Sequence, residues 1–219
     1  MKIRWLGQSG YILTGGETVI CIDPYLSDVV NRMANRPRTR AVAIKPEELR
    51  ANACICTHDH LDHIDIDAIP KMDKSITFYA PSSCKEKLSE LGVIKYEPFD
   101  EGTSYKIGDF KITAVFAEHT VPAVGVLVEY SGERLYFSGD TYYNEKLESI
   151  KCDYMFICIN GKLGNMNADE AARLTNIIKP RLAVPNHYDM FESNSENPAL
   201  FTENIKGGKT LEFNKEYTV

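Results

Sequence analysis

Histidine and aspartate residues are spaced in this sequence as ligands of a metal centre would be. Three of the five histidines fall in the run 58–63, and an aspartate, Asp62, lies among them. The other two, His119 and His187, each follow an apolar run that reads as a strand. Imidazole and carboxylate are the usual ligands of borderline first-row cations. With Asp140 as a further ligand, this pattern predicts a two-metal hydrolytic centre.

The spacing also predicts how the ligands divide between two ions. Residues two apart on extended backbone point to the same face, so His58 and His60 can hold one ion. Asp62 and His63 come after a bend and can reach a neighbouring ion. The expected sets are therefore His58, His60 and His119 on the first ion, Asp62, His63 and His187 on the second, and Asp140 bridging both.

Such a centre would perform hydrolysis. A water bridging two cations loses a proton near neutral pH and becomes a nucleophile that can attack the carbonyl of a lactone or a related ester. Asp62 and His63 are the catalytic candidates. Asp62 is expected to help hold the water, and either a metal-bound water or Asp62 to return a proton to the leaving alkoxide. The alternative is that these side chains are ordinary polar residues near turns. Mixed nitrogen and oxygen ligands suit Zn, Mn or Fe alike.

Composition limits the class of protein. A chain of 219 residues with 43% apolar residues suits one domain with a real core. The net charge of −6 argues against a nucleic-acid partner, and no apolar run is long enough to cross a bilayer. The first residues show no secretory signal, and the six cysteines form no CxxC pair. We therefore expect a cytoplasmic protein with reduced thiols.

The remaining sequence reads as short strands with interspersed helices. A hairpin is expected where two apolar runs flank Gly15-Gly16, and the clearest helix spans 167–179, with Asn167 as its cap and an apolar stripe that includes Ile177. Helices should lie outside and sheets inside, in a layered fold. The other strands are expected at 2–6, 53–57, 76–80, 110–116, 124–130, 134–137, 154–159 and 182–184, and further helices at 46–49 and 82–91.

The ligand pattern resembles the metallo-β-lactamase superfamily. The resemblance rests on the run His58-x-His60-x-Asp62-His63, followed in order by His119, by Asp140 in a Gly-Asp-Thr, and by His187. It implies a four-layer αββα sandwich of the α/β (α+β) class, with the metals at one sheet edge. It also implies that Asp23 orients a metal ligand through hydrogen bonds.

A narrower similarity points to the L-ascorbate-6-phosphate lactonase branch of that superfamily. It is carried by the runs 5–10, 57–65, 138–141 and 185–189, and by the region 31–33. The resemblance implies opening of a sugar-phosphate lactone with manganese, and self-association into a homo-oligomer. This chain is shorter than those lactonases, and its His119 is a departure from them that favours a full two-ion set.

Other residues are candidates for binding a small anionic substrate. The segment 26–45 is rich in arginine, and Arg32 and Arg36 could clamp a phosphate or carboxylate over the metals. A solvated loop or an oligomer contact is the alternative. Lys162 and Asn165, in a glycine-rich loop before a helix, could face the cleft or belong to a plain turn. Tyr188 could donate to an oxyanion or pack over the rim.

The sequence thus predicts a metal-dependent hydrolase of a small anionic substrate, with two divalent ions (Zn or Mn, with Fe as a third choice). One alternative is a phosphodiesterase or nuclease that uses the same metals. The other is a metal-binding protein without catalytic activity.

Overall fold

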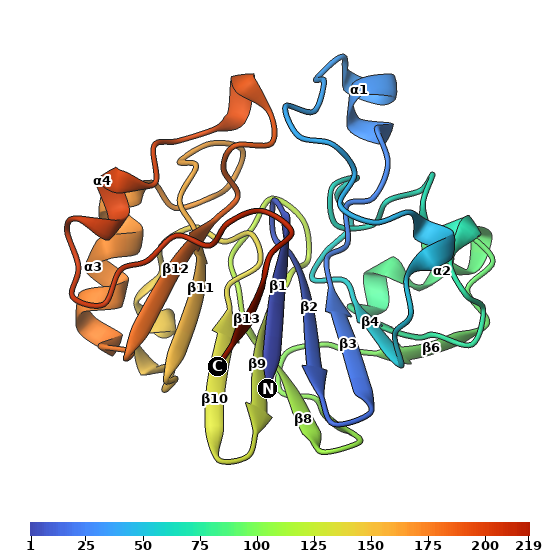
Figure 1. Ribbon diagram of the computed structural model, residues 1–219, viewed down its shortest axis with the longest axis horizontal. Coiled ribbons are helices and arrows are strands. Elements are labelled where there is room, and N and C mark those ends of the chain that lie inside the picture. Colours follow the sequence, from blue (N-terminus) through green and yellow to red (C-terminus); the bar gives the residue numbers. More distant parts are fainter.

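Two β-sheets pack face to face in the computed structural model, which describes residues 1–219 (Figure 1). The first sheet has the strand order β13-β1-β2-β3-β4-β5-β6, and the second has the order β12-β11-β10-β9-β8-β7. The strands of the first sheet are β1 (Lys2–Gly7), β2 (Gly10–Gly15), β3 (Thr18–Ile22), β4 (Ala53–Ile55), β5 (Thr77–Ala80), β6 (Lys95–Pro98) and β13 (Glu216–Thr218). Those of the second are β7 (Ser104–Ile107), β8 (Phe110–Phe116), β9 (Val124–Tyr130), β10 (Glu133–Phe137), β11 (Tyr154–Cys158) and β12 (Leu182–Asn186).

Helices cover the outer faces of this sandwich. In Figure 1, α3 and α4 lie beside β11 and β12, α2 lies on the side of β4 and β6, and α1 stands above the ends of the strands. The helices are α1 (Val29–Ala34), α2 (Lys85–Glu90), α3 (Ala168–Ile178) and α4 (Ala199–Thr202). Short 3-10 turns occupy Pro46–Glu48, Ile69–Lys71, Ser82–Cys84, Glu145–Ser149 and Glu192–Asn194. The predicted layered fold, with sheets inside and helices outside, is confirmed. None of these helices has the length and apolar character needed to cross a membrane.

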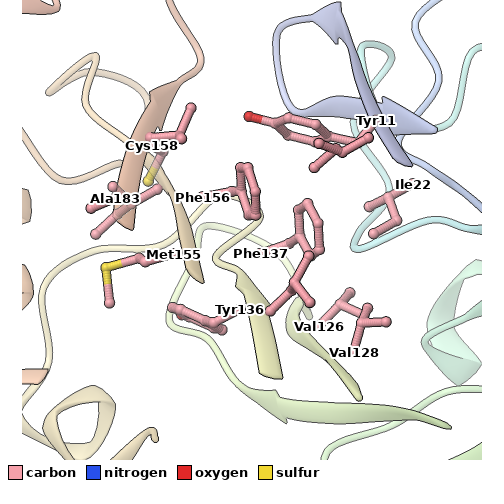
Figure 2. Close-up of a cluster of buried hydrophobic side chains, with 14 of the residues drawn as sticks. Tyr11, Ile22, Val126, Val128, Tyr136, Phe137, Met155, Phe156, Cys158 and Ala183 are labelled. Atoms are coloured by element: carbon pink, nitrogen blue, oxygen red, sulfur yellow. The ribbon is translucent and has the colours of Figure 1, made fainter. Parts of the chain in front are cut away.

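The core lies between the two sheets, where aromatic side chains of one sheet pack against those of the other (Figure 2). Tyr11 of β2 packs against Phe137 of β10 and Phe156 of β11, with ring centroids 5.1 Å away in each case. The two phenylalanine rings stack with their centroids 4.5 Å apart. Such aromatic pairs add about 0.5–1.5 kcal/mol beyond their burial, so these rings hold the two sheets in register.

The helix α3 begins and ends where the sequence predicts, but one residue of its stripe is misplaced. Asn167 and Glu170 form a capping box, in which each side chain accepts a hydrogen bond from the other's backbone N–H. Ile178 is buried, whereas Ile177 is 41% exposed. The inclusion of Ile177 in the apolar stripe was wrong, because adjacent helical residues point about 100° apart.

The predicted strands and the hairpin at Gly15-Gly16 are confirmed, and three strands were missed. The missed strands β6, β7 and β13 form edges of the two sheets, where most of their side chains are exposed or half-buried. An edge strand with little buried surface shows no apolar pattern, so local sequence gives no signal for it. The helix α1 falls in the segment 26–45, which shows no clear period.

Strand direction brings the candidate ligands to one margin. Strands β3 and β4 run parallel in the first sheet, and β8, β10 and β12 share one direction in the second. The carboxyl ends of these five strands precede Asp23, His58, His119, Asp140 and His187 respectively. The two sheets are joined there by a backbone hydrogen bond of 3.1 Å from Val124 N to Thr57 O.

Candidate metal centre

Three imidazole nitrogens converge at the first half of the centre. His60 Nδ1 lies 3.0 Å from His58 Nε2 and 3.2 Å from His119 Nε2. Asp140 Oδ2 lies 3.9 Å from His119 Nε2. One potential ligand atom from each of these four residues lies within 4.8 Å of the others. The structure therefore brings together the histidines that the sequence assigned to the first ion.

The second half of the centre is formed by Asp62, His63 and His187. Asp62 Oδ2 lies 3.5 Å from His187 Nε2 and 3.9 Å from His63 Nε2. Asp140 reaches this group as well, with Oδ1 at 3.2 Å from His63 Nε2 and Oδ2 at 3.1 Å from His187 Nε2. Its carboxylate thus lies within reach of both groups, as a residue shared between two ions would.

Hydrogen bonds on the far side of two rings fix which nitrogen faces the centre. The carbonyl oxygen of Gly164 lies 3.0 Å from His119 Nδ1, and Asp23 Oδ2 lies 2.9 Å from His63 Nδ1. Both oxygens are acceptors, so each Nδ1 carries the proton. When either ring is neutral, its Nε2 presents a lone pair to the centre.

Asp23 is held in turn by the residue that precedes the histidine run. The backbone N–H of Thr57 donates to Asp23 Oδ1 at 2.8 Å, and Thr57 Oγ1 donates to Oδ2 at 2.7 Å. Asp23 is fully buried and adopts a positive φ of 42° directly after β3. This geometry agrees with the orienting role that the resemblance implies for Asp23.

The donor atoms of this centre fit divalent cations. His63 Nε2 and Asp140 Oδ1 lie 3.2 Å apart and are buried, yet neither has a hydrogen-bond partner. Buried polar atoms without partners are costly, and a cation between them would satisfy both. Five imidazoles and two carboxylates form a mixed nitrogen and oxygen set that suits Zn, Mn or Fe.

Burial and neighbouring charges shift the pKa values of His58 and His187 in opposite directions. Burial lowers the pKa of His58 well below its usual value, and the neighbouring His63 lowers it further, so His58 is neutral. Burial opposes protonation of His187, but Asp140 and Asp62 outweigh it and raise the pKa to about 9. Burial likewise raises the pKa of Asp140, and His187 and His63 more than offset it, so Asp140 stays ionised.

A cavity of about 360 Å³ opens beside the ligands. Its metal-facing wall contains His60, Asp62, Asp140 and His187. Arg36 lines the cavity and makes no ion pair or hydrogen bond with the protein. Val30, Leu61, Thr120, Leu163 and Asn194 complete the lining.

The other arginines of the segment 26–45 are bound to the protein itself. Arg32 donates two hydrogen bonds to Asp67, at 3.0 and 2.6 Å, and lies outside the cavity. Arg38 lies over the Tyr25 ring with its guanidinium carbon 4.5 Å from the centroid, and Arg40 pairs with Asp189. The prediction that Arg32 faces the substrate is therefore corrected: an acidic partner 35 residues away holds it elsewhere.

The remaining substrate candidates also lie outside the cavity. Lys162 Nζ is exposed and donates to Ser193 O at 3.3 Å. Asn165 Nδ2 donates to Asp140 Oδ2 at 2.9 Å, so Asn165 supports a ligand. Tyr188 is 6% exposed and stacks on Trp5 with centroids 5.1 Å apart, which matches the packing alternative.

Sequence reasoning missed two residues that organise the centre. Gln8 is fully buried and contacts Asp62 at 2.8 Å. Asp65 accepts hydrogen bonds from the backbone of Leu26 and Ala68 at 2.9 and 3.0 Å, which ties the arginine-rich segment to the histidine run. Both residues stand in the runs that carry the lactonase resemblance, and that placement was the available signal.

Comparison with known proteins matches this chain to a β-lactamase superfamily domain and to metal-dependent hydrolases. The family model described as "Beta-lactamase superfamily domain" matches residues 18–188. A "UPF0173 metal-dependent hydrolase" of Archaeoglobus fulgidus is 28% identical over 250 residues, covering 98% of this chain and 100% of that protein. The structure of a possible metal-dependent hydrolase from Veillonella parvula matches with a TM-score of 0.85 and 18% identity, over 100% of this chain and 99% of the other. An isothiocyanate hydrolase from Delia radicum gut bacteria matches with a TM-score of 0.83 and 16% identity, over 100% and 99%. At these identities the two structures show a shared fold.

Proposed function

Because the chain belongs to the metallo-β-lactamase superfamily, we propose that its metal-dependent hydrolysis acts on a lactone or ester of a small anionic molecule. The observation that carries this proposal is the convergence of the ligand atoms beside a cavity into which one arginine is free to reach. Two divalent cations held by these residues would supply an activated water and an electrophile for the carbonyl.

Asp62 is the residue best placed to handle protons. Burial alone would raise the pKa of Asp62, but His63 and His187 lower it below its usual value, so the carboxylate is ionised. Asp62 lines the cavity and has the most exposed side chain of its group, at 17% against 0% for His63 and 2% for His187. It can accept a proton from the attacking water through a carboxylate oxygen and then pass that same proton to the leaving alkoxide. His63 is enclosed between Asp23 and the ligand atoms, so it serves to hold a cation.

Arg36 supplies recognition of the anionic group. A guanidinium presents a fork of donors that matches phosphate or carboxylate, and the fork of Arg36 is not occupied by the protein. Leu61 and Leu163 line the same cavity and make part of its wall apolar. One free guanidinium and a partly apolar wall favour a compact substrate with a single anionic end.

A sugar-phosphate lactone is the first substrate to examine. The runs that resemble those of the L-ascorbate-6-phosphate lactonases favour it, and the manganese that this resemblance implies makes Mn²⁺ a metal to compare with Zn²⁺. The presence of His119 in the first group favours two bound ions over one. The Archaeoglobus fulgidus relative is named for metal-dependent hydrolysis, and the lactone rests on these runs and on the cavity with its free arginine.

The test combines metal analysis with a substrate panel. Protein purified without chelator should contain up to two divalent ions per chain, and it should hydrolyse sugar-phosphate lactones faster than neutral lactones. Turnover of a chromogenic phosphodiester in place of lactones would favour the phosphodiesterase alternative. Tight metal binding with no turnover on any lactone, ester or phosphodiester would favour a non-catalytic role.

A further inference from the structure

Gln8 is a buried polar residue whose backbone is fixed beside the second group of ligands. It lies in the turn between β1 and β2 with a positive φ of 49°. Its carbonyl oxygen accepts hydrogen bonds from Trp5 Nε1 at 2.9 Å and from the backbone N–H of His187 at 3.2 Å. The ligand His187 and the turn that carries Gln8 are therefore held together by the main chain.

Only one end of the Gln8 side-chain amide has a partner. Nε2 donates to Asp62 Oδ2 at 2.8 Å and lies 3.3 Å from His187 Nε2. Oε1 is buried and accepts no hydrogen bond. A buried acceptor without a partner loses the hydrogen bonds that water would give it. The amide thus has a partner for its nitrogen and none for its oxygen.

The local charge explains this orientation and shows when it would reverse. Without a metal ion, the carboxylate of Asp62 at 2.8 Å attracts the N–H end of the amide and repels Oε1, and this contact is shorter than the 3.3 Å to the His187 ring. A divalent cation among Asp62, His63 and His187 would repel the N–H end and attract the amide oxygen. The side chain can exchange its two ends by rotating about its terminal torsion, which is soft and nearly two-fold.

Gln8 lies beside the second group of ligands, where its amide could add a further donor. That group consists of Asp62, His63 and His187, and Asp140, which also reaches it, brings its protein ligands to four. Four ligands are usual for Zn, and harder ions take more. We propose that Gln8 Oε1 is a ligand of the second cation, reached by rotation of the amide on metal binding, a role that rests on the proposed metal-dependent function.

Gln8 is the only glutamine in the chain, which makes the rotation directly observable. Protein labelled with ¹⁵N-glutamine shows a single side-chain NH₂ pair, to be followed by NMR while Zn²⁺, a diamagnetic ion, is added. We expect the hydrogen-bonded proton of this pair to change its shift with the second equivalent, because the bond to Asp62 is lost. A pair that stays unchanged through two equivalents overturns the proposal.

The crystal structure of the protein with two equivalents of Zn²⁺ gives the second readout. Oε1 should lie about 2.0–2.2 Å from the ion held by Asp62, as oxygen ligands of zinc do. A Gln8 amide that still donates to Asp62, with no atom at bonding distance from the ion, overturns the proposal.

Variants separate a ligand from a supporting hydrogen bond. Calorimetric titration with Zn²⁺ should show that Gln8→Leu lowers the affinity for the second equivalent by more than about 100-fold. Loss of a residue that only supports a ligand lowers metal affinity by about 10–100-fold, so a larger loss indicates a ligand. Gln8→Glu keeps an oxygen donor and should retain the second equivalent. Ser9→Ala, at the neighbouring buried residue, should leave both equivalents unchanged. A loss below about 100-fold in Gln8→Leu contradicts ligation. If the wild-type protein binds no cation, the proposed function fails; if it binds two while Gln8 remains on Asp62, only the ligand role fails.

Discussion

His63 Nδ1 lies 2.9 Å from Asp23 Oδ2, and both side chains are completely buried. The carboxylate of Asp23 also accepts two hydrogen bonds from Thr57, so a single acid joins the end of β3, the end of β4 and the histidine run. Because Asp23 fixes the proton on Nδ1, it determines that Nε2 of His63 faces the centre. The pair links the fold of the first sheet to the orientation of a metal ligand.

Replacing Asp23 should weaken metal binding more than it changes the fold. In Asp23→Asn the amide keeps its size but loses the charge that favours the Nδ1–H form of His63. We expect metal affinity to fall by about 10–100-fold, the usual effect of losing such a partner. Calorimetric titration measures this, with Asp73→Asn, at an exposed turn, as the control. Unchanged affinity in Asp23→Asn would show that the hydrogen bond does not orient the ligand.

Arg36 and Arg32 form a matched pair for testing substrate recognition. Arg36 lines the cavity without a protein partner, whereas Arg32 is engaged by Asp67. A hydrogen bond to a charged group contributes about 1.5–3 kcal/mol, so Arg36→Ala should raise the KM for an anionic substrate by about 10–100-fold. Steady-state kinetics on anionic and neutral esters should show no such change for Arg32→Ala. Equal effects of both substitutions would contradict a specific role for Arg36.

Metal affinity should increase with pH. In the metal-free protein, burial lowers the pKa of His187, but Asp140 and Asp62 raise it to about 9, so a cation must displace a proton from this ring. The apparent affinity should therefore rise with pH up to about 9 and level off above that. Titration calorimetry in buffers of different ionisation enthalpy would report the released protons. Binding that releases no proton at pH 7 would contradict a protonated His187.

The same shift affects the stability of the metal-free protein with the opposite sign. A histidine whose folded pKa is raised stabilises the fold at pH values below its unfolded pKa, near 6.5, and loses that contribution as pH rises through about 9. Denaturant unfolding in the presence of a chelator should show this decline from pH 6.5 to 9. A stability that increases over that range would be inconsistent with the pairing of His187 with Asp140.

Gly164 positions His119 through a close approach that a side chain would prevent. A Cβ atom at position 164 would lie 2.6 Å from His119 Nδ1, and its φ is +99°. Gly164→Ala should displace the His119 ring and lower the metal affinity of the first group of ligands by about tenfold or more. Gly132→Ala is the control, because Gly132 also has a positive φ, of +84°, but a Cβ there meets nothing within 4 Å. Metal titration that gives the same result for both variants would rule out the effect on His119.

Much of the fold was predicted from the sequence because its elements carry local signals. The hairpin around Gly15-Gly16, the strands before the ligands and the capped helix α3 are each defined by turn residues or periodicity within a few positions. The edge strands β6, β7 and β13 were not predicted from the sequence, because their pairing depends on a neighbouring strand and not on buried side chains of their own. The exposure of Ile177 depended on which face of α3 meets the sheet.

For the site, the sequence by itself determined which residues have the chemistry and order of metal ligands. Histidine and aspartate at strand ends are recognisable one at a time, and two-residue spacing already places His58 and His60 on one face. Only the tertiary structure decided which arginine is left free for a substrate, because the partners that engage Arg32 and Arg40, Asp67 and Asp189, are distant in the chain. It likewise decided that Gln8 adjoins the ligands. Ligand chemistry belongs to single residues, whereas pairing and burial belong to contacts that form only when the chain folds.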